Sequence, residues 1–421
     1  MIYFVQGADL VKTVGIIVEY NPLHNGHVLH YKKSKAIAQA ERTVAVMSGN
    51  FLQRGEPALA GKRARTEMAL SMGADLVIEL PAAYAIQPAE WFAYGAVSLL
   101  HATGVVDSLC FGSESGTLRE LTPLAALLSA EDSPFREELH RQMSLGHSYP
   151  AAYAAAAGAA QGSSPAEAAE ITSLLGKPNN TLGLHYLMAL RRLNSPIQAY
   201  TIPREAAQYH DLLPAGPTIA SATSIRRIIR EQGLEAAAPY MPRYTLDILR
   251  RETALGRGPV DWEAFKQPLF LLLQTLSTRG LSRMLEVSEG LEHRIKRLLP
   301  LLPQPSVEEL ISALKTKRYT RTKLQRMLLH ILLQHSKEEL SPERLAHGPG
   351  YIRVLGFSSR GQELLKAMKK SAALPVIMQA SDLEHPQLEL DVQASAAYAG
   401  AYPDPHTSWM YEDYLMPPLR L

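Results

Sequence analysis

Short apolar runs alternate with amphipathic stretches along the first 110 residues of the chain. The apolar runs have the length and the β-branched content of strands that are covered on both faces. They lie at residues 14–18, 43–47, 76–80 and 108–111. The stretches at 61–72 and 89–101 have the period of helices, and Gly73 and Gly104 follow them where a C-terminal cap is expected. This alternation predicts βαβ units and a parallel sheet.

The pattern changes after the fourth strand. Residues 115–175 are rich in Ala, Ser and Glu and carry no chemical motif, so we interpret them as a helical insertion. The elements that return to the sheet and close this domain are a helix at 181–193, a strand at 198–202 and a helix at 224–232. From about residue 235 the sequence predicts mainly helices. The exceptions are two late strands, at 351–357 and 374–378, which flank a helix at 361–370.

Composition is ordinary for a globular protein. The chain has 421 residues, of which 46% are hydrophobic and 20% charged, enough for two or three domains. Its net charge of +2 means that a nucleic-acid surface would have to come from a local cluster. The single cysteine, Cys110, excludes an intrachain disulfide and a multi-cysteine zinc site. The histidines lack the spacing of metal ligands, so we predict no structural metal.

The chain start does not have the form of a signal peptide. Residues 1–9 lack a basic segment and a long apolar segment. No run reaches the roughly 18 apolar residues that span a bilayer, so we expect no membrane association. We predict a cytoplasmic protein in which residues 1–12 form an extension ahead of the fold.

A His-x-Gly-His turn follows the first strand. The next helix should begin near His24, and the unpaired N–H groups of its first turn favour an anion. Gly26 lets a phosphate approach the backbone, and His24 and His27 are spaced to face it together. Two histidines at this spacing could equally be a surface pair. The strand in front of them favours a nucleotide phosphate site.

A second candidate phosphate element spans residues 219–227. Thr223 or Ser224 is placed to cap the helix that follows, and Arg226 lies one turn into that helix. The alternative is an ordinary capped helix with solvated arginines.

Further candidates follow the other strands, because ligands of open parallel sheets bind beyond the carboxyl ends of the strands. Gln53 and Arg54 come after the second strand and Gly112 comes at the end of the fourth. Asn179 and Arg204 are candidates for adenosine contacts, since amides recognise base edges or ribose hydroxyls and arginine stacks or binds phosphate.

A basic segment between residues 315 and 326 contains no acidic residue. Such runs are commonly solvated helix faces, but the lack of compensating acids suits contact with RNA phosphates. Arg227 and Arg230 could extend this surface toward the phosphate elements. The candidate RNA-binding residues are Arg227, Arg230, Lys315, Lys317, Arg318, Arg321, Lys323 and Arg326.

Four segments together resemble the bacterial tRNA(Met) cytidine acetate ligase family. They lie at residues 18–27, 49–56, 110–114 and 177–180. The His-x-Gly-His turn is also the signature of the wider nucleotidyltransferase superfamily. Residues 221–226 are similar to that superfamily's Ser-Ser-Thr-x-Ile-Arg signature, with Ala222 in place of its second serine. This departure weakens a hydroxyl contact and leaves the cap and the arginine intact. The resemblance runs from about Thr13 to the C-terminus.

The resemblance implies a reaction in two steps. Acetate attacks the α-phosphate of ATP to give acetyl-adenylate and pyrophosphate, and N4 of the wobble cytidine of elongator tRNA(Met) then takes the acetyl group to give N4-acetylcytidine. Mg²⁺ is expected to accompany ATP. His24, His27 and Arg226 are the expected catalytic residues, and Gln53 and Arg54 form the expected acyl and phosphate loop. The expected ATP-binding residues are Ile17, Val18, Glu19, Tyr20, Asn21, Pro22, Leu23, His24, Asn25, Gly26, His27, Val28, Leu29, His30, Gly112, Asn179, Arg204, Ser221, Thr223 and Ser224.

The expected fold class is α/β. A Rossmann-like nucleotidyltransferase domain with a parallel sheet occupies residues 13–234, with its helical insertion at about 115–175, and a predominantly α-helical tRNA-binding region occupies 235–421. No stable protein partner is predicted. Two other functions compete with the ligase. An adenylyltransferase acting on a small phosphorylated metabolite would usually be a compact single domain, and a non-catalytic RNA-binding protein would not need the intact His24, His27 and Arg226.

Overall fold

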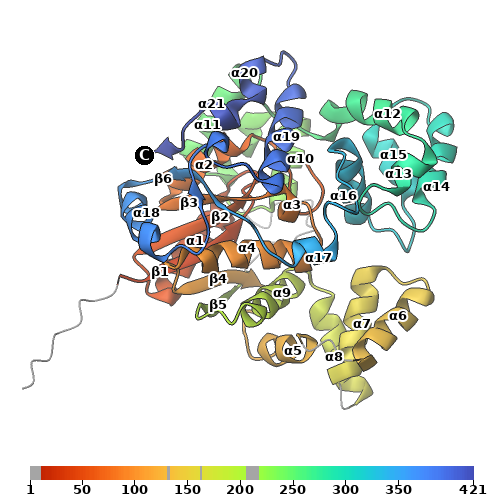
Figure 1. Cartoon of the computed structure of the whole chain (residues 1–421), viewed down its shortest axis with the longest axis horizontal. Helices are drawn as coiled ribbons and strands as arrows, with labels where there is room; N and C mark the ends of the chain where they lie inside the picture. Colours follow the sequence, from red (N-terminus) through yellow and green to blue (C-terminus); the bar gives the residue numbers. More distant parts are fainter. Residues whose placement is uncertain (1–10, 130–132, 162–163, 205–217) are drawn as a thin grey trace, which may run out of the picture.

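The computed structural model describes residues 11–129, 133–161, 164–204 and 218–421. Most of the predicted N-terminal extension therefore lies outside the described residues. One eight-stranded sheet runs through the molecule in the order β5-β4-β1-β2-β3-β6-β7, with β8 beside β6 (Figure 1). The strands are β1 (Thr13–Val18), β2 (Arg42–Ser48), β3 (Leu76–Leu80), β4 (Ser108–Ser113), β5 (Gln198–Pro203), β6 (Ile352–Phe357), β7 (Val376–Ile377) and β8 (Leu419–Arg420).

The sheet is parallel over the strands predicted for the N-terminal domain, and a late strand extends it in the antiparallel direction. Strands β1 to β5 are parallel to one another, but β6 pairs with β3 in the antiparallel direction. Strands β7 and β8 both pair with β6. Residues after 350 thus add β6, β7 and β8 to the same sheet. The predicted boundary at residue 234 therefore does not separate all of the sheet from the C-terminal region.

Helices cover both faces of the sheet because successive side chains of a strand point to opposite sides. Val44 and Val46 of β2 pack with α4 and α9. Ala45 and Met47 pack with α2, α10 and α11. The helices around the sheet are α1 (Asn25–Ala38), α2 (Lys62–Met72), α3 (Ala82–Ala85), α4 (Ala89–Thr103), α9 (Pro178–Arg192), α10 (Ala222–Gln232), α11 (Arg243–Ala254) and α18 (Ser359–Ser371).

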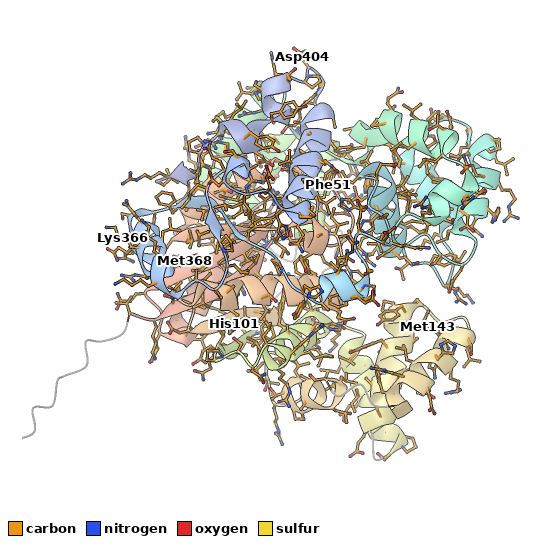
Figure 2. The ribbon with its side chains drawn as sticks, in the orientation of Figure 1. Phe51, His101, Met143, Lys366, Met368 and Asp404 are labelled. Atoms are coloured by element: carbon orange, nitrogen blue, oxygen red, sulfur yellow. The ribbon has the colours of Figure 1, made fainter. Side chains whose placement is uncertain are left out.

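Two helical units extend from the sheet and its surrounding helices, and both lie on the same side of the molecule in Figure 1. The insertion contains α5 (Leu121–Leu128), α6 (Ser133–Ser144), α7 (Tyr149–Gln161) and α8 (Pro165–Leu175). The other unit contains α12 (Lys266–Thr275), α13 (Thr278–Ser282), α14 (Leu291–Leu298), α15 (Val307–Leu314) and α16 (Arg321–Leu332), and its core also includes Phe51 from the loop after β2. In the view of Figure 2, Met143 marks the insertion below this second unit.

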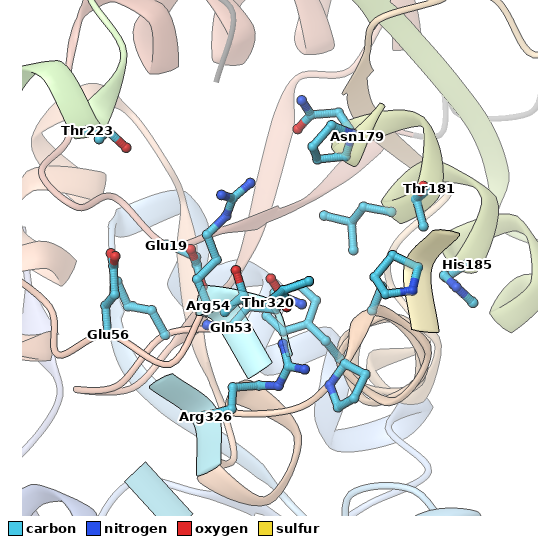
Figure 3. Close-up of a pocket in the computed structure, with 18 of the residues that line it drawn as sticks. Glu19, Gln53, Arg54, Glu56, Asn179, Thr181, His185, Thr223, Thr320 and Arg326 are labelled. Carbon is cyan, nitrogen blue, oxygen red and sulfur yellow. Dashed lines mark hydrogen bonds between the residues drawn. The ribbon is translucent and has the colours of Figure 1, made fainter. Parts of the chain in front are cut away.

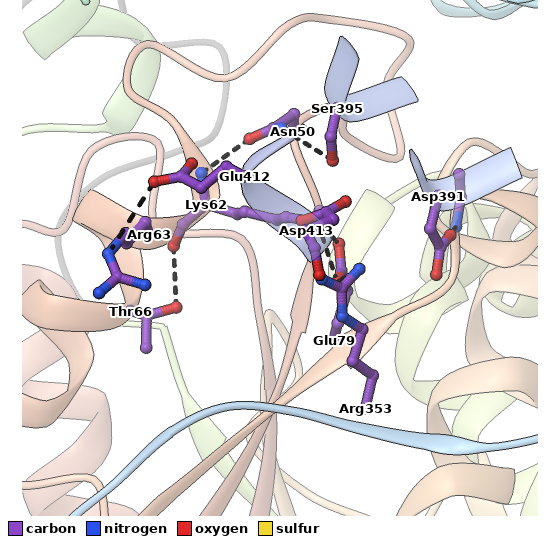
Figure 4. A network of polar contacts seen from close by, with 12 residues as sticks. Asn50, Lys62, Arg63, Thr66, Glu79, Arg353, Asp391, Ser395, Glu412 and Asp413 are labelled. Carbon is purple, nitrogen blue, oxygen red and sulfur yellow. Dashed lines mark hydrogen bonds and ion pairs between the residues drawn. The ribbon is translucent and has the colours of Figure 1, made fainter. Parts of the chain in front are cut away.

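The C-terminal segment is tied to the sheet by a buried ionic network (Figure 4). Its helices are α17 (Pro342–Leu345), α19 (Pro386–Gly400), α20 (Thr407–Met410) and α21 (Glu412–Leu415). Lys62 Nζ lies 2.8 Å from both Glu79 and Asp413, and Arg353 lies 3.1 Å from Glu79 and 2.8 Å from Asp413. All four side chains are at most 5% exposed, so each charge depends on the others for compensation. Within the described ranges no helix is long and apolar enough to cross a membrane.

Candidate active site

A large cavity opens beyond the carboxyl ends of β1, β4 and β5. Its volume is about 1160 Å³, and its lining includes Ile17, Gly112 and Ile202 from the ends of these strands. Figure 3 shows Glu19, Gln53, Arg54 and Glu56 near one another, with Asn179 across from them. This is the edge of the sheet at which the sequence predicted a ligand.

The two histidines of the His-x-Gly-His turn begin α1. His24 is the N-cap, and its Nδ1 accepts the N–H of Gly26 at 3.1 Å, while Nδ1 of His27 accepts the N–H of His24 at 3.2 Å. A neutral imidazole that accepts at Nδ1 carries its proton on Nε2. This hydrogen-bond pattern therefore assigns both rings as N–H donors at Nε2, with their centroids 3.8 Å apart.

Burial keeps both rings neutral. Burial, followed by the nearby cations Arg204 and Arg226, lowers the pKa of His24 to about 3. Burial, then His24 and Arg204, hold the pKa of His27 well below its usual range. Gly26 is needed because a Cβ there would lie 2.9 Å from Cε1 of His24. The turn thus presents two neutral donors that suit phosphate oxygens without acting as acids or bases.

The second phosphate element begins α10, but its cap is not the predicted one. Ser221 is the N-cap and its hydroxyl accepts the N–H of Ser224 at 3.1 Å, so the assignment of Thr223 or Ser224 as the cap is wrong. Ser224 is fully buried and lies outside the cavity lining, whereas Ser221, Thr223 and Arg226 line it.

Arg226 is held by two partners at the cavity wall. It donates to the carbonyl oxygen of Asn21 at 3.0 Å and to Oε2 of Glu56 at 2.9 Å. Glu56 is the last residue of the segment 49–56, but the sequence did not predict it as a site residue. Its carboxylate compensates the arginine, and an arriving phosphate would compete for the same guanidinium.

Buried polar contacts fix the loop after β2. Glu19 accepts the backbone N–H of Gln53 at 2.7 Å, and burial raises the pKa of this carboxyl group. The buried Arg65 donates to the backbone carbonyls of Glu19, Ser48 and Gly49, and so joins the ends of β1 and β2. Sequence reasoning missed Arg65 because it lies inside an ordinary amphipathic helix pattern.

A third cluster lies at the start of α9. The carboxylate of Glu114 accepts the N–H groups of Asn179 and Asn180 at 3.2 and 2.8 Å, and the amide of Asn179 at 2.6 Å. Arg204 donates to Oδ1 of Asn179 at 2.7 Å. A Cβ at Gly112 would lie 3.1 Å from Cγ of Arg204. Gly112, Asn179 and Arg204 line the cavity, and Glu114 holds Asn179 in place from outside the lining. Their assignment to the adenosine side stays a prediction.

Most of the first motif faces the cavity. The lining residues from it are Ile17, Val18, Glu19, Tyr20, Asn21, His24, Gly26, His27, Leu29 and His30. Pro22, Leu23, Asn25 and Val28 do not line the cavity. The Asn25 amide instead donates to the carbonyls of Thr218 and Pro239, at 2.9 and 3.1 Å, and so joins this turn to the residues that flank α10.

The basic segment also lines the cavity, but its charge is partly compensated. All six of its basic residues are in the lining, namely Lys315, Lys317, Arg318, Arg321, Lys323 and Arg326. Acids from other elements pair with its arginines: Glu289 with Arg318, Glu308 with Arg321, and Glu286 with Arg326. The segment therefore has no acidic residue in its own sequence, but acidic residues of other elements compensate its arginines in the folded chain. Arg227 and Arg230 lie outside the lining and approach Glu231, at 2.9 and 3.9 Å.

No group of three or more His, Cys, Asp or Glu side chains within the described ranges could hold a metal ion.

Comparisons with known proteins agree with this geometry. The chain is 41% identical over 414 residues to the tRNA(Met) cytidine acetate ligase of Geobacillus sp. (strain WCH70), covering 97% of this chain and 100% of that protein. It is 40% identical over 416 residues to the protein of the same name from Bacillus subtilis (strain 168), covering 97% of each.

Solved structures give the same result. The crystal structure of apo Thermotoga maritima TmcAL matches with a TM-score of 0.90 at 34% identity, and TmcAL bound with alpha-thio ATP matches with 0.88 at 33%. Both comparisons cover 97% of this chain and 99% of the other. Residues 11–412 match the family described as HIGH Nucleotidyl Transferase. The chain therefore belongs to the HIGH nucleotidyl transferases and, among them, to the tRNA(Met) cytidine acetate ligase family.

Proposed function

We propose that this protein uses ATP to activate acetate as acetyl-adenylate and transfers the acetyl group to N4 of a tRNA cytidine. The names of its relatives point to a cytidine of tRNA(Met) as the acceptor. Within that acceptor we propose the wobble cytidine of the elongator form, with N4-acetylcytidine as the product. The observation that carries the proposal is that one cavity contains both phosphate elements and the basic segment. A site for a small phosphorylated metabolite would not need the basic segment in its lining.

In the first step an acetate oxygen attacks the α-phosphorus of ATP and pyrophosphate leaves. Negative charge grows on the phosphate oxygens and the leaving group, so donors and cations aimed there lower the barrier. The Nε2–H groups of His24 and His27 would supply neutral donors, and Arg226 would supply charge. Acetate is ionised at neutral pH, so this step needs no general base.

The ends of α1 and α10 orient the triphosphate, and the wall formed by Gly112, Asn179 and Arg204 would hold the adenosine. Gln53 and Arg54 lie in the loop fixed by Glu19, which borders the space between these groups and suits the acetate and the α-phosphate. The binding of alpha-thio ATP by Thermotoga maritima TmcAL supports ATP as the nucleotide. We propose that Mg²⁺ enters with ATP and is held mostly by phosphate oxygens and water.

In the second step the N4 amine of cytidine attacks the acetyl carbonyl carbon. The C–N bond forms, the bond to the phosphate oxygen breaks, AMP leaves and the amine loses a proton. Lys315 and Lys317 would bind RNA phosphates beside the nucleotide, since no ion pair to either is present in the described part of the chain.

The test combines the protein with ATP, labelled acetate and bulk tRNA. Label should enter tRNA only when ATP is present, and pyrophosphate release without tRNA should depend on acetate. Absence of both signals would reject the ligase. Pyrophosphate release that needs a phosphorylated metabolite would instead identify an adenylyltransferase. His27→Ala should abolish acetyl-adenylate formation and leave tRNA affinity unchanged, whereas loss of both would show that the histidine is structural.

A further inference from the structure

The helical insertion forms part of the same cavity, although its sequence carries no motif. Leu175 of α8 is in the lining, and so are five residues nearer the middle of the insertion, namely Met143, Ser148, Tyr149, Pro150 and Tyr153. These five come from α6, from the start of α7 and from the connection between the two. At about 1160 Å³ the cavity exceeds the roughly 300–1,000 Å³ that is usual for a small-molecule site, so ATP and acetate leave room unfilled.

A cluster of aromatic rings supports the part of the insertion that lines the cavity. The ring of Tyr153 lies 5.2 Å from Phe135 and 5.6 Å from His185 of α9, so it is fixed between the insertion and the main layer. Tyr149 packs against Tyr153 with ring centroids 6.0 Å apart and remains 48% exposed. Neighbouring Leu145 is 61% exposed. Tyr149 thus presents a large ring whose position is set by the rings beneath it.

The basic segment also lines this cavity, so cationic and aromatic surfaces border one space. Lys315 and Lys317 suit phosphates, and Tyr149 suits a flat apolar ring. A single-stranded RNA loop carries both groups, with its bases unstacked and its phosphates exposed. An acidic peptide would use the lysines but would not need an exposed tyrosine supported by further rings.

We propose that α6 and α7 form a base-binding wall in which Tyr149 stacks on a nucleobase of the tRNA loop, next to the cytidine that is acetylated. The inference rests on the proposed function, because that function supplies the RNA. It gives the helical insertion a role in binding a nucleobase, and the relatives' names do not mention this role. Stacking on one aromatic ring contributes about 1–3 kcal/mol per base, so its loss should weaken RNA binding by roughly 5-fold to 150-fold.

The experiment measures binding of the full-length protein to a synthetic anticodon stem-loop with a cytidine at the wobble position. Tyr149→Ala should weaken binding by at least 5-fold, whereas Tyr149→Phe and Tyr149→Trp should stay close to the original protein because they keep a ring. Tyr411→Ala is the matched control, because Tyr411 is 49% exposed and lies outside the cavity lining. Acetate-dependent pyrophosphate release without RNA should persist in all four variants, which also shows that they fold.

Salt dependence separates stacking from charge. Lys317→Ala should lower the slope of log Kd against log salt concentration by about 1, because it removes one phosphate contact. Tyr149→Ala should leave that slope unchanged. Unaltered binding by Tyr149→Ala, or a slope that falls as in Lys317→Ala, would overturn the proposal.

The proposed function can fail independently. If no RNA is acetylated but Tyr149→Ala still weakens stem-loop binding, the wall is supported and the ligase is rejected. If Tyr149→Ala acetylates tRNA with an unchanged KM, the ligase is supported and the wall is rejected.

Discussion

Gly55→Ala tests how tightly the loop after β2 is fitted to the C-terminal helices. Gly55 adopts a φ of +75°, and a Cβ there would lie 2.2 Å from the backbone nitrogen of Arg326 and 2.5 Å from the carbonyl carbon of Gln325. The indole N–H of Trp262 also donates to its carbonyl oxygen at 2.9 Å. The loop that carries Gln53 and Arg54 therefore touches the backbone of α16 directly.

The expected effect follows from these distances. A Cβ in ordinary contact lies 3.4–4 Å from its neighbours, so alanine at this position forces the loop and α16 apart by roughly 1 Å. The positive φ adds about 1–2 kcal/mol of backbone strain. A displacement of about 1 Å at catalytic groups costs on the order of 100-fold in rate. We expect Gly55→Ala to lower acetate-dependent ATP–pyrophosphate exchange by about that factor.

Gly256→Ala is the matched control. Gly256 has a similar φ of +70°, and a Cβ there would meet no atom within 4 Å, so this variant carries the strain without the contact. Thermal unfolding should show a loss of stability in both variants, with the larger loss in Gly55→Ala. Exchange should be nearly unchanged in Gly256→Ala. Equal exchange in the two variants would refute the claim that the fit between loop and helix positions the site.

Three further predictions concern charge. Burial lowers the pKa of several histidines, to about 3 for His24 and about 4 for His30, His185 and His335. Their unfolded forms take up protons below pH 6.5 while the native forms do not, so the stability that they contribute is complete above pH 6.5 and is lost as pH falls. Each costs about 1.4 kcal/mol at pH 5.5, and Asp391, whose pKa burial raises to about 7, opposes them by about 2 kcal/mol. His27 and His330, whose pKa values burial holds well below the usual range, each cost the same amount. Urea unfolding should therefore show a loss of about 6 kcal/mol between pH 7.5 and 5.5, and a flat profile would contradict the burial of neutral histidines. Lys62→Met should lower the unfolding free energy by about 3–5 kcal/mol, because it leaves the buried carboxylates of Glu79 and Asp413 undercompensated. Arg63→Met, at a half-buried pair 3.9 Å long, should cost less than about 1 kcal/mol, and equal losses would argue against the network. Glu114→Gln should raise the KM for ATP about 10-fold and leave tRNA affinity unchanged, because an amide cannot accept every hydrogen bond that Asn179 and Asn180 donate; an unchanged KM in pyrophosphate exchange would count against the adenosine wall.

The sequence alone predicted those elements whose burial produces a local pattern of apolar residues. The predicted strands at 14–18 and 43–47 correspond to β1 and β2, because a strand covered on both faces is apolar throughout. The late strand at 351–357 is also present, as β6. Its antiparallel pairing with β3 was not predictable, since apolar periodicity shows that a strand is buried but not which strand it pairs with.

The site was predictable where one local turn contains the chemistry. The His-x-Gly-His turn needs only neighbouring residues for its caps and tautomers. The cap of α10 was missed because Ser221, Thr223 and Ser224 are all good caps and the choice depends on where the helix begins. The compensation of the basic segment was missed because Glu286, Glu289 and Glu308 reach it only in the folded chain.

One cavity for both half-reactions has a chemical reason. Acetyl-adenylate is a mixed anhydride that water attacks, so an enzyme that released it would lose it before it met RNA. In this fold the loop that borders the acetate region contacts α16, which continues from the basic segment, and Gln325 of that helix approaches Glu56 at 3.4 Å. Glu56 also accepts a hydrogen bond from Arg226, so α16 and the phosphate site share this side chain. In the proposed function, RNA phosphates bind along this helix next to the groups that hold the intermediate, so acetyl transfer requires no movement of the intermediate between sites.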